Sequence, residues 1–254
     1  MKVSIITVSF NSADTIEETI QSVISQDYPL IEYIIIDGKS TDNTISIVKK
    51  YSAGISKIVS EKDKGIYDAM NKGINLATGD IVGILNSDDS YAHSKVITQV
   101  AEKFKTTNAE GVYGDLVYVS RTNKNKISRF WQAGEYKDGM FLKGWMPPHP
   151  TFYVKKNIYE KYGAFNTVFK SAADYELMLR LIHKEKIKIS YLNEVLVKMS
   201  LGGKSNLSLI NRIKANQEDR LAWKINGLLP GIFTLYLKPF SKIRQFFNIR
   251  YTIH

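Results

Sequence analysis

The chain has 254 residues, of which 44% are hydrophobic and 11% aromatic, enough for a folded core and too many for a disordered protein. It has no cysteine, which excludes disulfide bonds, thiol catalysis and cysteine-based zinc or iron–sulfur sites. The formal net charge of +10 is concentrated in residues 195–254, where ten Lys/Arg accompany two Asp/Glu. This distribution predicts a nearly neutral body and a basic tail, typical of a protein that meets an anionic surface such as lipid headgroups or nucleic acid.

Apolar periodicity in the first 85 residues predicts alternating strands and helices. Four strands are expected, at residues 2–8, 31–36, 56–60 and 80–85. Three helices are expected between them, at residues 14–26, 42–51 and 66–77. Asp14 and Glu17 resemble a capping box at the start of the first helix. This order predicts an α/β fold in which a mostly parallel sheet is flanked by helices on both faces.

Polar segments follow all four predicted strands. They are Ser9-Phe10-Asn11, Asp37 to Asp42, Glu61 to Gly65 and Asn86-Ser87-Asp88-Asp89. In parallel sheets, ligands bind at the carboxyl ends of the strands. Three of the four segments contain Asp, and carboxylates that recur at one edge of a sheet predict a binding site there.

The adjacent carboxylates of Asp88 and Asp89 are the most informative of these residues. Like charges this close repel each other, and desolvation adds to the cost. A divalent cation removes the cost, because hard cations prefer carboxylate oxygens. The pair therefore predicts a metal site that also holds an anion such as a diphosphate. The alternative is a solvated turn that caps a helix near Ser94.

The second half of the chain is less regular. Residues 111–120 and 151–154 are expected to form strands, and residues 121–129 a basic loop. Three prolines exclude a helix from residues 146–150. A helix with one apolar face is expected to begin at Ala172.

Five motifs together resemble family 2 of the inverting, GT-A type glycosyltransferases over about residues 1–200. They are Thr7-Val8-Ser9-Phe10-Asn11, Asp37-Gly38-x-Ser40-Thr41-Asp42, Gly65-x-x-x-Ala69-x-Asn71-x-Gly73, Asp88-Asp89 and Ala173-Asp174-Tyr175-Glu176. The resemblance implies a Rossmann-like GT-A fold and transfer of a sugar, with inversion, from a nucleotide-diphospho-sugar that we expect to be UDP-linked. The run from Glu61 to Gly73 is similar to a subgroup that builds bacterial surface polysaccharides. That similarity implies a glycan acceptor, with a polyprenyl-diphosphate-linked oligosaccharide as the expected form.

The resemblance also implies roles for individual residues in holding the donor. Thr7, Ser9 and Asp37 would hold the uridine, Asp63 would face the base, Asp88 would contact the ribose or the donor sugar, and Asp89 would bind Mg²⁺ or Mn²⁺ at the diphosphate. For Asp37 the alternative is a turn residue that bonds to its own backbone.

One position departs from the family's pattern. Many relatives have Arg before the Asn of the Ala-x-Asn motif, where it would be placed to pair with phosphate. Here the residue is Met70, whose spacing with Ile66 and Ile74 suits a core position. Lys72 or Lys64 is then the candidate to contact the donor.

Two residues of the second half complete the expected site. Asp174 resembles the general base that takes a proton from the acceptor hydroxyl; the alternative is an N-cap of the helix that follows. His149 lies in the rigid Pro-Pro-His-Pro turn and is a candidate metal ligand or diphosphate contact. The alternative is a structural, hydrogen-bonded histidine.

We expect two units, a GT-A domain at residues 1–205 and a basic helical tail at residues 206–254. From Ile232 onward apolar residues recur on one helical face, and no acid occurs after Asp219, which predicts an amphipathic helix lying on an anionic membrane. Alternatively this face packs on the domain or on a second copy of the chain, since an oligomer is possible. The apolar N-terminal stretch is too short for a signal peptide, so we expect a cytoplasmic protein at the inner face of the cell membrane.

Two other functions fit parts of the sequence. A nucleotidyltransferase that makes nucleotide sugars shares the α/β core, but usually has a Gly- and Arg/Lys-rich loop after its first strand, where this chain has residues 9–13 without Gly or a basic residue. A nucleic-acid-binding protein would suit the sequence pI of about 9.4. The charge, however, is confined to the tail and lacks the base-stacking motifs of the usual modules, so we expect no nucleic-acid partner.

Overall fold

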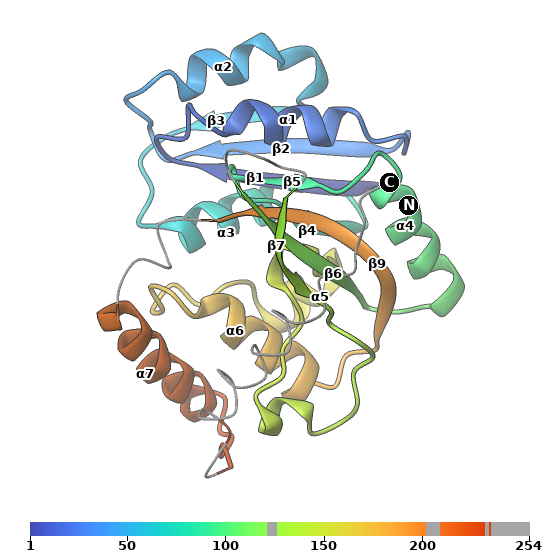
Figure 1. Ribbon diagram of the computed structural model, residues 1–254, viewed down its shortest axis with the longest axis vertical. Coiled ribbons are helices and arrows are strands. Elements are labelled where there is room, and N and C mark those ends of the chain that lie inside the picture. The colour runs from blue at the N-terminus through green and yellow to red at the C-terminus, as the bar shows by residue number, and fades with distance from the viewer. Residues whose placement is uncertain (121–125, 202–208, 232–233, 235–254) are drawn as a thin grey trace.

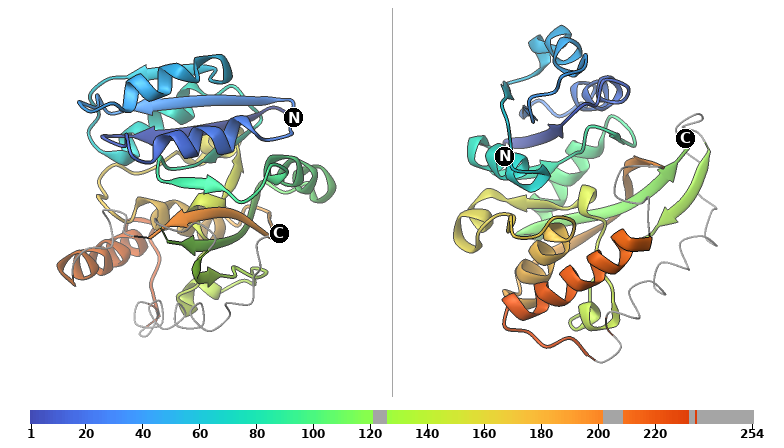
Figure 2. Two further views of the ribbon diagram at one scale, coloured as in Figure 1. Left: turned by 45° about the horizontal axis from the view of Figure 1, so that its top comes forward. Right: turned by 90° about the vertical axis from the view of Figure 1, so that its left-hand side faces the viewer.

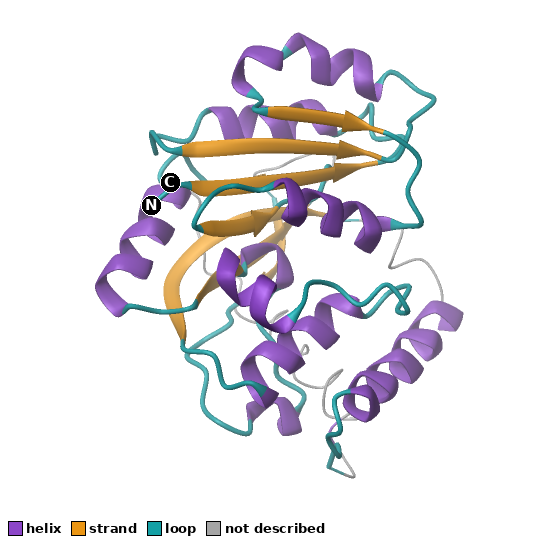
Figure 3. Ribbon diagram, turned by 180° about the vertical axis from the view of Figure 1, so that it is seen from behind, coloured by secondary structure: helices purple, strands orange, loops and turns teal. Residues whose placement is uncertain are grey.

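The computed structural model describes residues 1–120, 126–201, 209–231 and 234, with the backbone alone for residues 209–215. A mixed sheet lies between two layers of helices (Figures 1 and 3). Its strands are β1 (Val3–Ser9), β2 (Ile31–Asp37), β3 (Lys57–Ser60), β4 (Ile81–Ile84), β5 (Asp89–Tyr91), β6 (Gly111–Val119), β7 (Ile127–Trp131), β8 (Tyr153–Lys155) and β9 (Ile189–Ser200). The α-helices are α1 (Ile16–Ile24), α2 (Thr44–Lys50), α3 (Ile66–Leu76), α4 (Val96–Thr107), α5 (Lys156–Tyr162), α6 (Ala173–Met178), which continues as a π-helical turn to Lys184, and α7 (Leu209–Ile225).

The sheet is parallel in its first half and mixed in its second. The strand order is β3-β2-β1-β4-β8-β6-β9-β5, with β7 paired to β6. β1 pairs with β2 and β4, and β2 with β3, all in parallel. Beyond β4, β6 and β9 are parallel, whereas β8, β5 and β7 run antiparallel to their neighbours. The predicted α/β class and its helix-covered parallel strands are confirmed, and the antiparallel strands extend the sheet past β4.

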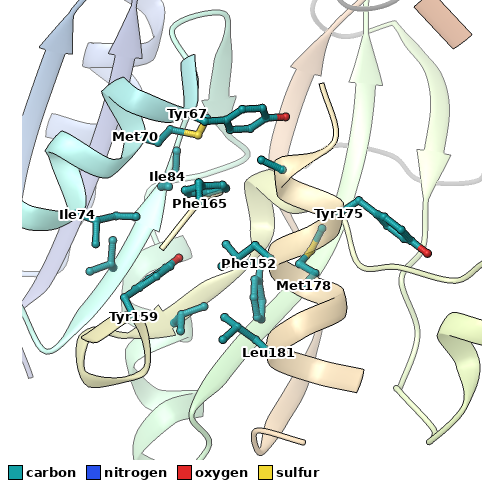
Figure 4. Packing of buried hydrophobic residues seen from close by; sticks show 14 of the residues in the cluster. Tyr67, Met70, Ile74, Ile84, Phe152, Tyr159, Phe165, Tyr175, Met178 and Leu181 are labelled. Carbon is teal, nitrogen blue, oxygen red and sulfur yellow. The ribbon is translucent and has the colours of Figure 1, made fainter. Parts of the chain in front are cut away.

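Both faces of the parallel strands are buried, which explains their continuous apolar sequences. On β2, Ile34 and Ile36 join the core formed with α3, α5, α6 and α7, while Tyr33 and Ile35 join the core under α1, α2 and α4. Met70 is buried in the first of these cores, as Figure 4 shows, so its core interpretation is confirmed.

Helix α3 packs very closely on the sheet. A Cβ atom at Gly73 would lie 2.4 Å from the Ile6 side chain of β1, so only glycine fits there. This close approach is a structural reason for glycine at position 73, the last residue of the Gly65–Gly73 motif.

Some local predictions were wrong. Helix α1 begins at Ile16 after Thr15, and no side chain caps its first turn, so the expected capping box of Asp14 and Glu17 does not form. Strands β5, β7 and β9 were not anticipated. β7 begins inside the expected basic loop 121–129 and extends two residues beyond it, and its residues are half-buried.

The beginning of the expected tail packs on the body of the protein. Helix α7 lies beside α6 (Figures 1 and 2), and the buried indole of Trp223 donates a 2.8 Å hydrogen bond to the hydroxyl of Tyr175. The boundary at 205/206 stays a prediction, and the predicted amphipathic face from Ile232 onward lies outside the described residues except for Thr234. No helix among the described residues is long and apolar enough to cross a membrane.

Candidate active site

The carboxyl ends of β1, β2 and β3 lie side by side. In the parallel register Ser9 is level with Asp37, and Asp37 is level with Ser60. The chain turns polar directly after these positions, because the loops that follow leave the buried sheet. This edge therefore gathers the first three polar segments predicted from the sequence.

Asp37 is fully buried and bonded to the protein on both carboxylate oxygens. It accepts hydrogen bonds from Ser9 Oγ (3.2 Å), the Ser40 backbone N–H (2.9 Å), Ser40 Oγ and Ser60 Oγ (2.7 Å). A carboxylate has about four acceptor positions, and all are used here. Asp37 thus joins the ends of three strands, in line with its alternative role as a turn residue, and a nucleoside would have to replace one of these donors.

Beside Asp37, an exposed aromatic ring and a carboxylate meet over a glycine. A Cβ atom at Gly38 would lie 2.5 Å from Asp63 Oδ2 and 3.4 Å from the Phe10 ring. Phe10 is 53% exposed, and Asp63 is half-buried with one oxygen accepting from the Gly65 N–H at 2.9 Å. A ring that offers its face beside a carboxylate that accepts N–H bonds suits a nucleobase. The sequence predicted Asp63 but missed Phe10, although an apolar residue in a polar loop was the available signal.

Two residues expected at the donor are engaged elsewhere. Thr7 is fully buried in β1, where its hydroxyl accepts a 3.1 Å hydrogen bond from Tyr33, so it can support the strand but cannot reach a ligand. Lys72 forms ion pairs with Glu61 at 2.8 Å and Asp68 at 3.7 Å. The bond to Glu61 is the main reason that the pKa of Lys72 is raised. Lys72 therefore ties the loop between β3 and α3 to its helix.

The two adjacent aspartates have different environments. Asp89 is the first residue of β5, is 1% exposed, and accepts a 3.4 Å hydrogen bond from Asn86 Nδ2. Asp88 is half-buried, and its carboxylate has no hydrogen bond or ion pair with the residues that the structure describes. Asn86 Oδ1 is also buried without a hydrogen-bond partner in the described part of the chain. The free oxygens of Asp88 and Asn86 are the hard donors that a divalent cation prefers.

A preassembled metal cage is absent: the described residues hold no group of three or more His, Cys, Asp or Glu placed to bind an ion. The predicted metal ligands Asp89 and His149 stay a prediction. Mg²⁺ bound with a nucleotide commonly uses only one or two carboxylates and takes its other ligands from phosphate and water. Asp88 with Asn86 fits that arrangement.

Asp174 lies in the first turn of α6, where it contacts Tyr67 of α3. The N-cap residue is Ala172, and no side chain caps the helix, so the capping alternative for Asp174 is wrong. One carboxylate oxygen accepts a 3.4 Å hydrogen bond from the Tyr67 hydroxyl. Burial, followed by the charge of Asp174, raises the pKa of Tyr67 strongly, so the phenol stays protonated and can donate. The carboxylate is half-buried and otherwise available.

His149 lies near Asp174, and its role as a metal ligand or diphosphate contact stays a prediction. Its ring meets the edge of Phe165 at 5.6 Å, and Phe165 stacks on Tyr67 at 5.6 Å (Figure 4). Burial lowers the pKa of His149, and the charge of Asp174 only partly offsets this, so the imidazole is neutral near pH 7. Asn71 fixes Phe165 by bonding both its backbone N–H (2.9 Å) and its carbonyl (2.8 Å).

Comparisons with known proteins identify the family of the chain. The profile of the family described as Glycosyl transferase family 2 matches residues 4–172, which ends two residues before Asp174. An uncharacterized glycosyltransferase of Mycobacterium tuberculosis is 33% identical over 180 residues, or 70% of this chain and 68% of that protein.

Solved structures share the fold. Staphylococcus aureus TarS 1-349 in complex with UDP-GlcNAc has a TM-score of 0.68 at 18% identity, over 89% of this chain and 65% of that one. A mannosyltransferase of Pyrobaculum calidifontis, in complex with GDP-Man and Mn²⁺, has a TM-score of 0.66 at 21% identity, over 94% of this chain and 69% of that one. This likeness confirms the predicted GT-A fold, and the family match removes the nucleotidyltransferase alternative. The chain belongs to glycosyl transferase family 2.

Proposed function

We propose that this protein is an inverting, metal-dependent glycosyltransferase that moves a sugar from a UDP-sugar to a glycan acceptor in the synthesis of a bacterial surface polysaccharide. The observation that carries the proposal is the carboxylate of Asp88, half-buried at the carboxyl edge of the parallel strands and without a protein partner. A carboxylate in this state is costly unless a cation completes it. The related structures, which hold UDP-GlcNAc or GDP-Man with Mn²⁺, support a nucleotide-sugar and metal at such an edge.

The donor is held by the first half of the chain. Phe10 offers a face to the uracil ring and Asp63 accepts its N–H, while Asp37 keeps the three strand ends in place. Asp88, with Asn86, is the residue we assign to the metal in place of Asp89, because Asp89 is buried in β5. A bound Mn²⁺ or Mg²⁺ would neutralise charge on the departing diphosphate.

The acceptor is activated by the second half. The carboxylate of Asp174 takes the proton from the acceptor hydroxyl while that oxygen forms a bond to the anomeric carbon. The bond between this carbon and the diphosphate oxygen breaks on the opposite side, so the configuration inverts and UDP leaves. Tyr67 donates to one oxygen of Asp174 and so directs the other toward the acceptor.

A lipid-linked acceptor would require the protein to meet a membrane. Leu221 and Ile225 of α7 are exposed apolar residues spaced by four, Leu229 is exposed beyond the end of the helix, and the exposed cations Arg220 and Lys224 lie beside them in the sequence. Exposed apolar residues flanked by cations suit the headgroup region of an anionic leaflet. We therefore place the protein at the inner face of the cell membrane. In this proposal the exposed residues of α7 continue into the amphipathic segment predicted from Ile232 onward.

A hydrolysis screen tests the proposed function. The protein is incubated with Mn²⁺ and, in turn, UDP-glucose, UDP-galactose, UDP-GlcNAc and GDP-mannose, and release of the nucleoside diphosphate is measured. We expect one UDP-sugar to be turned over and EDTA to stop the reaction. Turnover that persists in EDTA would contradict the metal role, and turnover of GDP-mannose alone would contradict the uridine assignment.

A further inference from the structure

Glu218 of α7 binds the backbone that leads into the proposed base. One carboxylate oxygen accepts from the Lys170 N–H at 3.1 Å. The other accepts from the Ser171 N–H (2.9 Å), Ser171 Oγ (3.0 Å) and the Ala172 N–H (2.9 Å). Four bonds from one side chain thus fix three consecutive residues that lie 46 to 48 positions earlier in the chain.

Core packing holds the two ends of this segment, at Phe169 and Ala172, whereas Lys170 and Ser171 are exposed. The first N–H groups of a helix have no partner within the helix, and α6 is only six residues long before its π-helical turn. Glu218 accepts from the N–H groups of residues 170–172, and the Tyr67 hydroxyl donates to the Asp174 carboxylate at 3.4 Å. The start of α6 is therefore held from two sides, by α3 through Tyr67 and by α7 through Glu218.

Two further contacts align α7 along α6. Trp223 donates to the Tyr175 hydroxyl at 2.8 Å, and Asn226 donates to Glu176 Oε1 at 3.0 Å. Glu176 is itself paired with Arg180 at 2.8 Å. These contacts hold Tyr175 and Glu176, which directly follow Asp174 in α6. Glu218 instead binds residues 170–172, which lead into the base.

We propose that Glu218 is a positioning residue, which holds the backbone of residues 170–172 so that the carboxylate of Asp174 faces the acceptor hydroxyl. The inference rests on the proposed role of Asp174 as the base. A displacement of about 1 Å in a reacting group can lower a rate by roughly 100-fold. Because Lys170 and Ser171 are exposed, water can satisfy their N–H groups once Glu218 is removed, and the segment can then move without unfolding the protein.

Two substitutions at this position separate geometry from general stability. Glu218→Ala removes all four bonds. Glu218→Gln can keep the three bonds to one oxygen and loses the bond from Lys170. We expect kcat for hydrolysis of the UDP-sugar found in the screen to fall about 10- to 100-fold in the Ala variant, with KM and UDP affinity within twofold of wild type. The Gln variant should recover most of that loss.

Two control variants match the test. Gln217→Ala changes an exposed neighbour on the same helix and should leave all measurements unchanged. Asn226→Ala weakens the docking of α7 on the part of α6 that follows the base, and should lower the melting temperature more than kcat.

Hydrogen–deuterium exchange supplies a readout that needs no substrate. In Glu218→Ala the amides of residues 170–172 should exchange faster, while those of β1 and β2 should not change. In an Asp174→Asn background, Glu218→Ala should lower kcat no further, because a positioning residue acts only through the base.

The outcomes distinguish this inference from the proposed function. If Asp174→Asn is inactive and Glu218→Ala has the kcat of wild type, the positioning role is wrong and the base assignment stands. If Asp174→Asn keeps full activity, or the wild type turns over no nucleotide sugar, the proposed function fails and the positioning role fails with it. A loss in Glu218→Ala that appears only in UDP affinity or melting temperature would also overturn the inference.

Discussion

The two edges of the parallel strands both carry acidic side chains, but these carboxylates differ in how many hydrogen bonds they accept from the protein. At the amino-terminal edge, Glu32 is buried and accepts from Ser4 Oγ (2.6 Å), the Thr78 N–H (2.7 Å), Thr78 Oγ1 (2.7 Å) and Lys2 Nζ (3.0 Å). Burial alone would raise the pKa of Glu32, but these bonds together lower it to about 2. At the carboxyl edge, Asp88 has no partner in the described part of the chain.

The difference indicates which edge serves stability and which serves chemistry. A buried carboxylate with all its bonds made stabilises the fold, whereas one left without partners costs free energy and is kept where a ligand completes it. Asp37 belongs to the first kind although it lies at the carboxyl edge, because it joins three strands. Asp88 is of the second kind. Asp63 and Asp174 lie between the two, because each is half-buried and accepts a single hydrogen bond from the described residues, from the Gly65 N–H and from Tyr67 respectively.

The largest effect should come from Asp174→Asn. We expect kcat to fall by about 10²- to 10⁴-fold, the usual scale for loss of a general base, with unchanged UDP affinity. Because Asp174 does not cap its helix, the melting temperature should change little. Glu32→Gln, the same type of change at the other edge, should keep full kcat. Equal losses of kcat in both variants would contradict the claim that only the carboxyl edge takes part in catalysis.

The next largest effect is expected at Phe10. Base stacking on an aromatic ring contributes roughly 1–3 kcal/mol, so Phe10→Ala should weaken UDP binding by about 5- to 150-fold. Leu30→Ala is the matched control, because Leu30 is 54% exposed at the amino-terminal edge. Calorimetric titration with UDP checks both variants. Equal affinity in wild type and Phe10→Ala would remove Phe10 from the site.

Glu32 should affect stability rather than binding, by a free energy similar in size to that expected for Phe10. Glu32→Gln should lower the free energy of unfolding at pH 7 by about 1–3 kcal/mol, mainly through the bonds to Ser4 and Thr78, since Lys2 is 43% exposed and its ion pair contributes little. The pKa of Glu32 in the folded state, about 2, lies below the ordinary value of 4.5 for a glutamate. The stabilisation is therefore complete above about pH 4.5 and lost as pH falls toward 2. Denaturant titrations should show a smaller difference in the free energy of unfolding between variant and wild type at pH 3 than at pH 7. An equal difference at the two pH values would contradict the role of the Glu32 hydrogen bonds.

The smallest effect concerns Asp115, a buried carboxylate in the middle of β6. Burial raises its pKa to about 6, against bonds from the Ala133 N–H and Tyr191 that lower it. A raised pKa favours the protonated form in the folded state, so stability should fall as pH rises from about 4 to 6. Asp115→Asn removes this dependence, and should gain about 1–2 kcal/mol relative to wild type between pH 4 and pH 7. The check is the denaturant midpoint of wild type and of Asp115→Asn at several pH values in this range. A constant difference between the two midpoints would show that Asp115 is ionised like a surface group.

The sequence predicted most of the first half of the fold, for a physical reason. β1 to β4 are buried on both faces and the helices between them have one apolar face, so local patterns suffice, with ends mostly within two residues. β5 and β7 are short, and their burial depends on β9 and β6, whose positions no local pattern reveals.

The site could be predicted only in part. Adjacent residues of a strand point to opposite faces, so the order Asp88-Asp89 could not show which carboxylate faces inward; pairing of β5 with β9 decides it. Thr7 was expected at the uridine because of its motif, but its strand buries it. Tyr67 and Glu218 act on Asp174 from 107 and 44 positions away in the chain, and no spacing rule connects such residues.

Calorimetric titration with UDP, with and without Mn²⁺, tests the central claim most directly. The wild type should bind UDP more tightly with Mn²⁺, and Glu32→Gln should behave in the same way. Asp88→Ala should lose the effect of Mn²⁺ without losing thermal stability, because its side chain has no partner in the described part of the chain. If Asp88→Ala keeps the Mn²⁺ effect, or if Mn²⁺ has no effect on the wild type, the assignment of the carboxyl edge as a metal and diphosphate site is wrong.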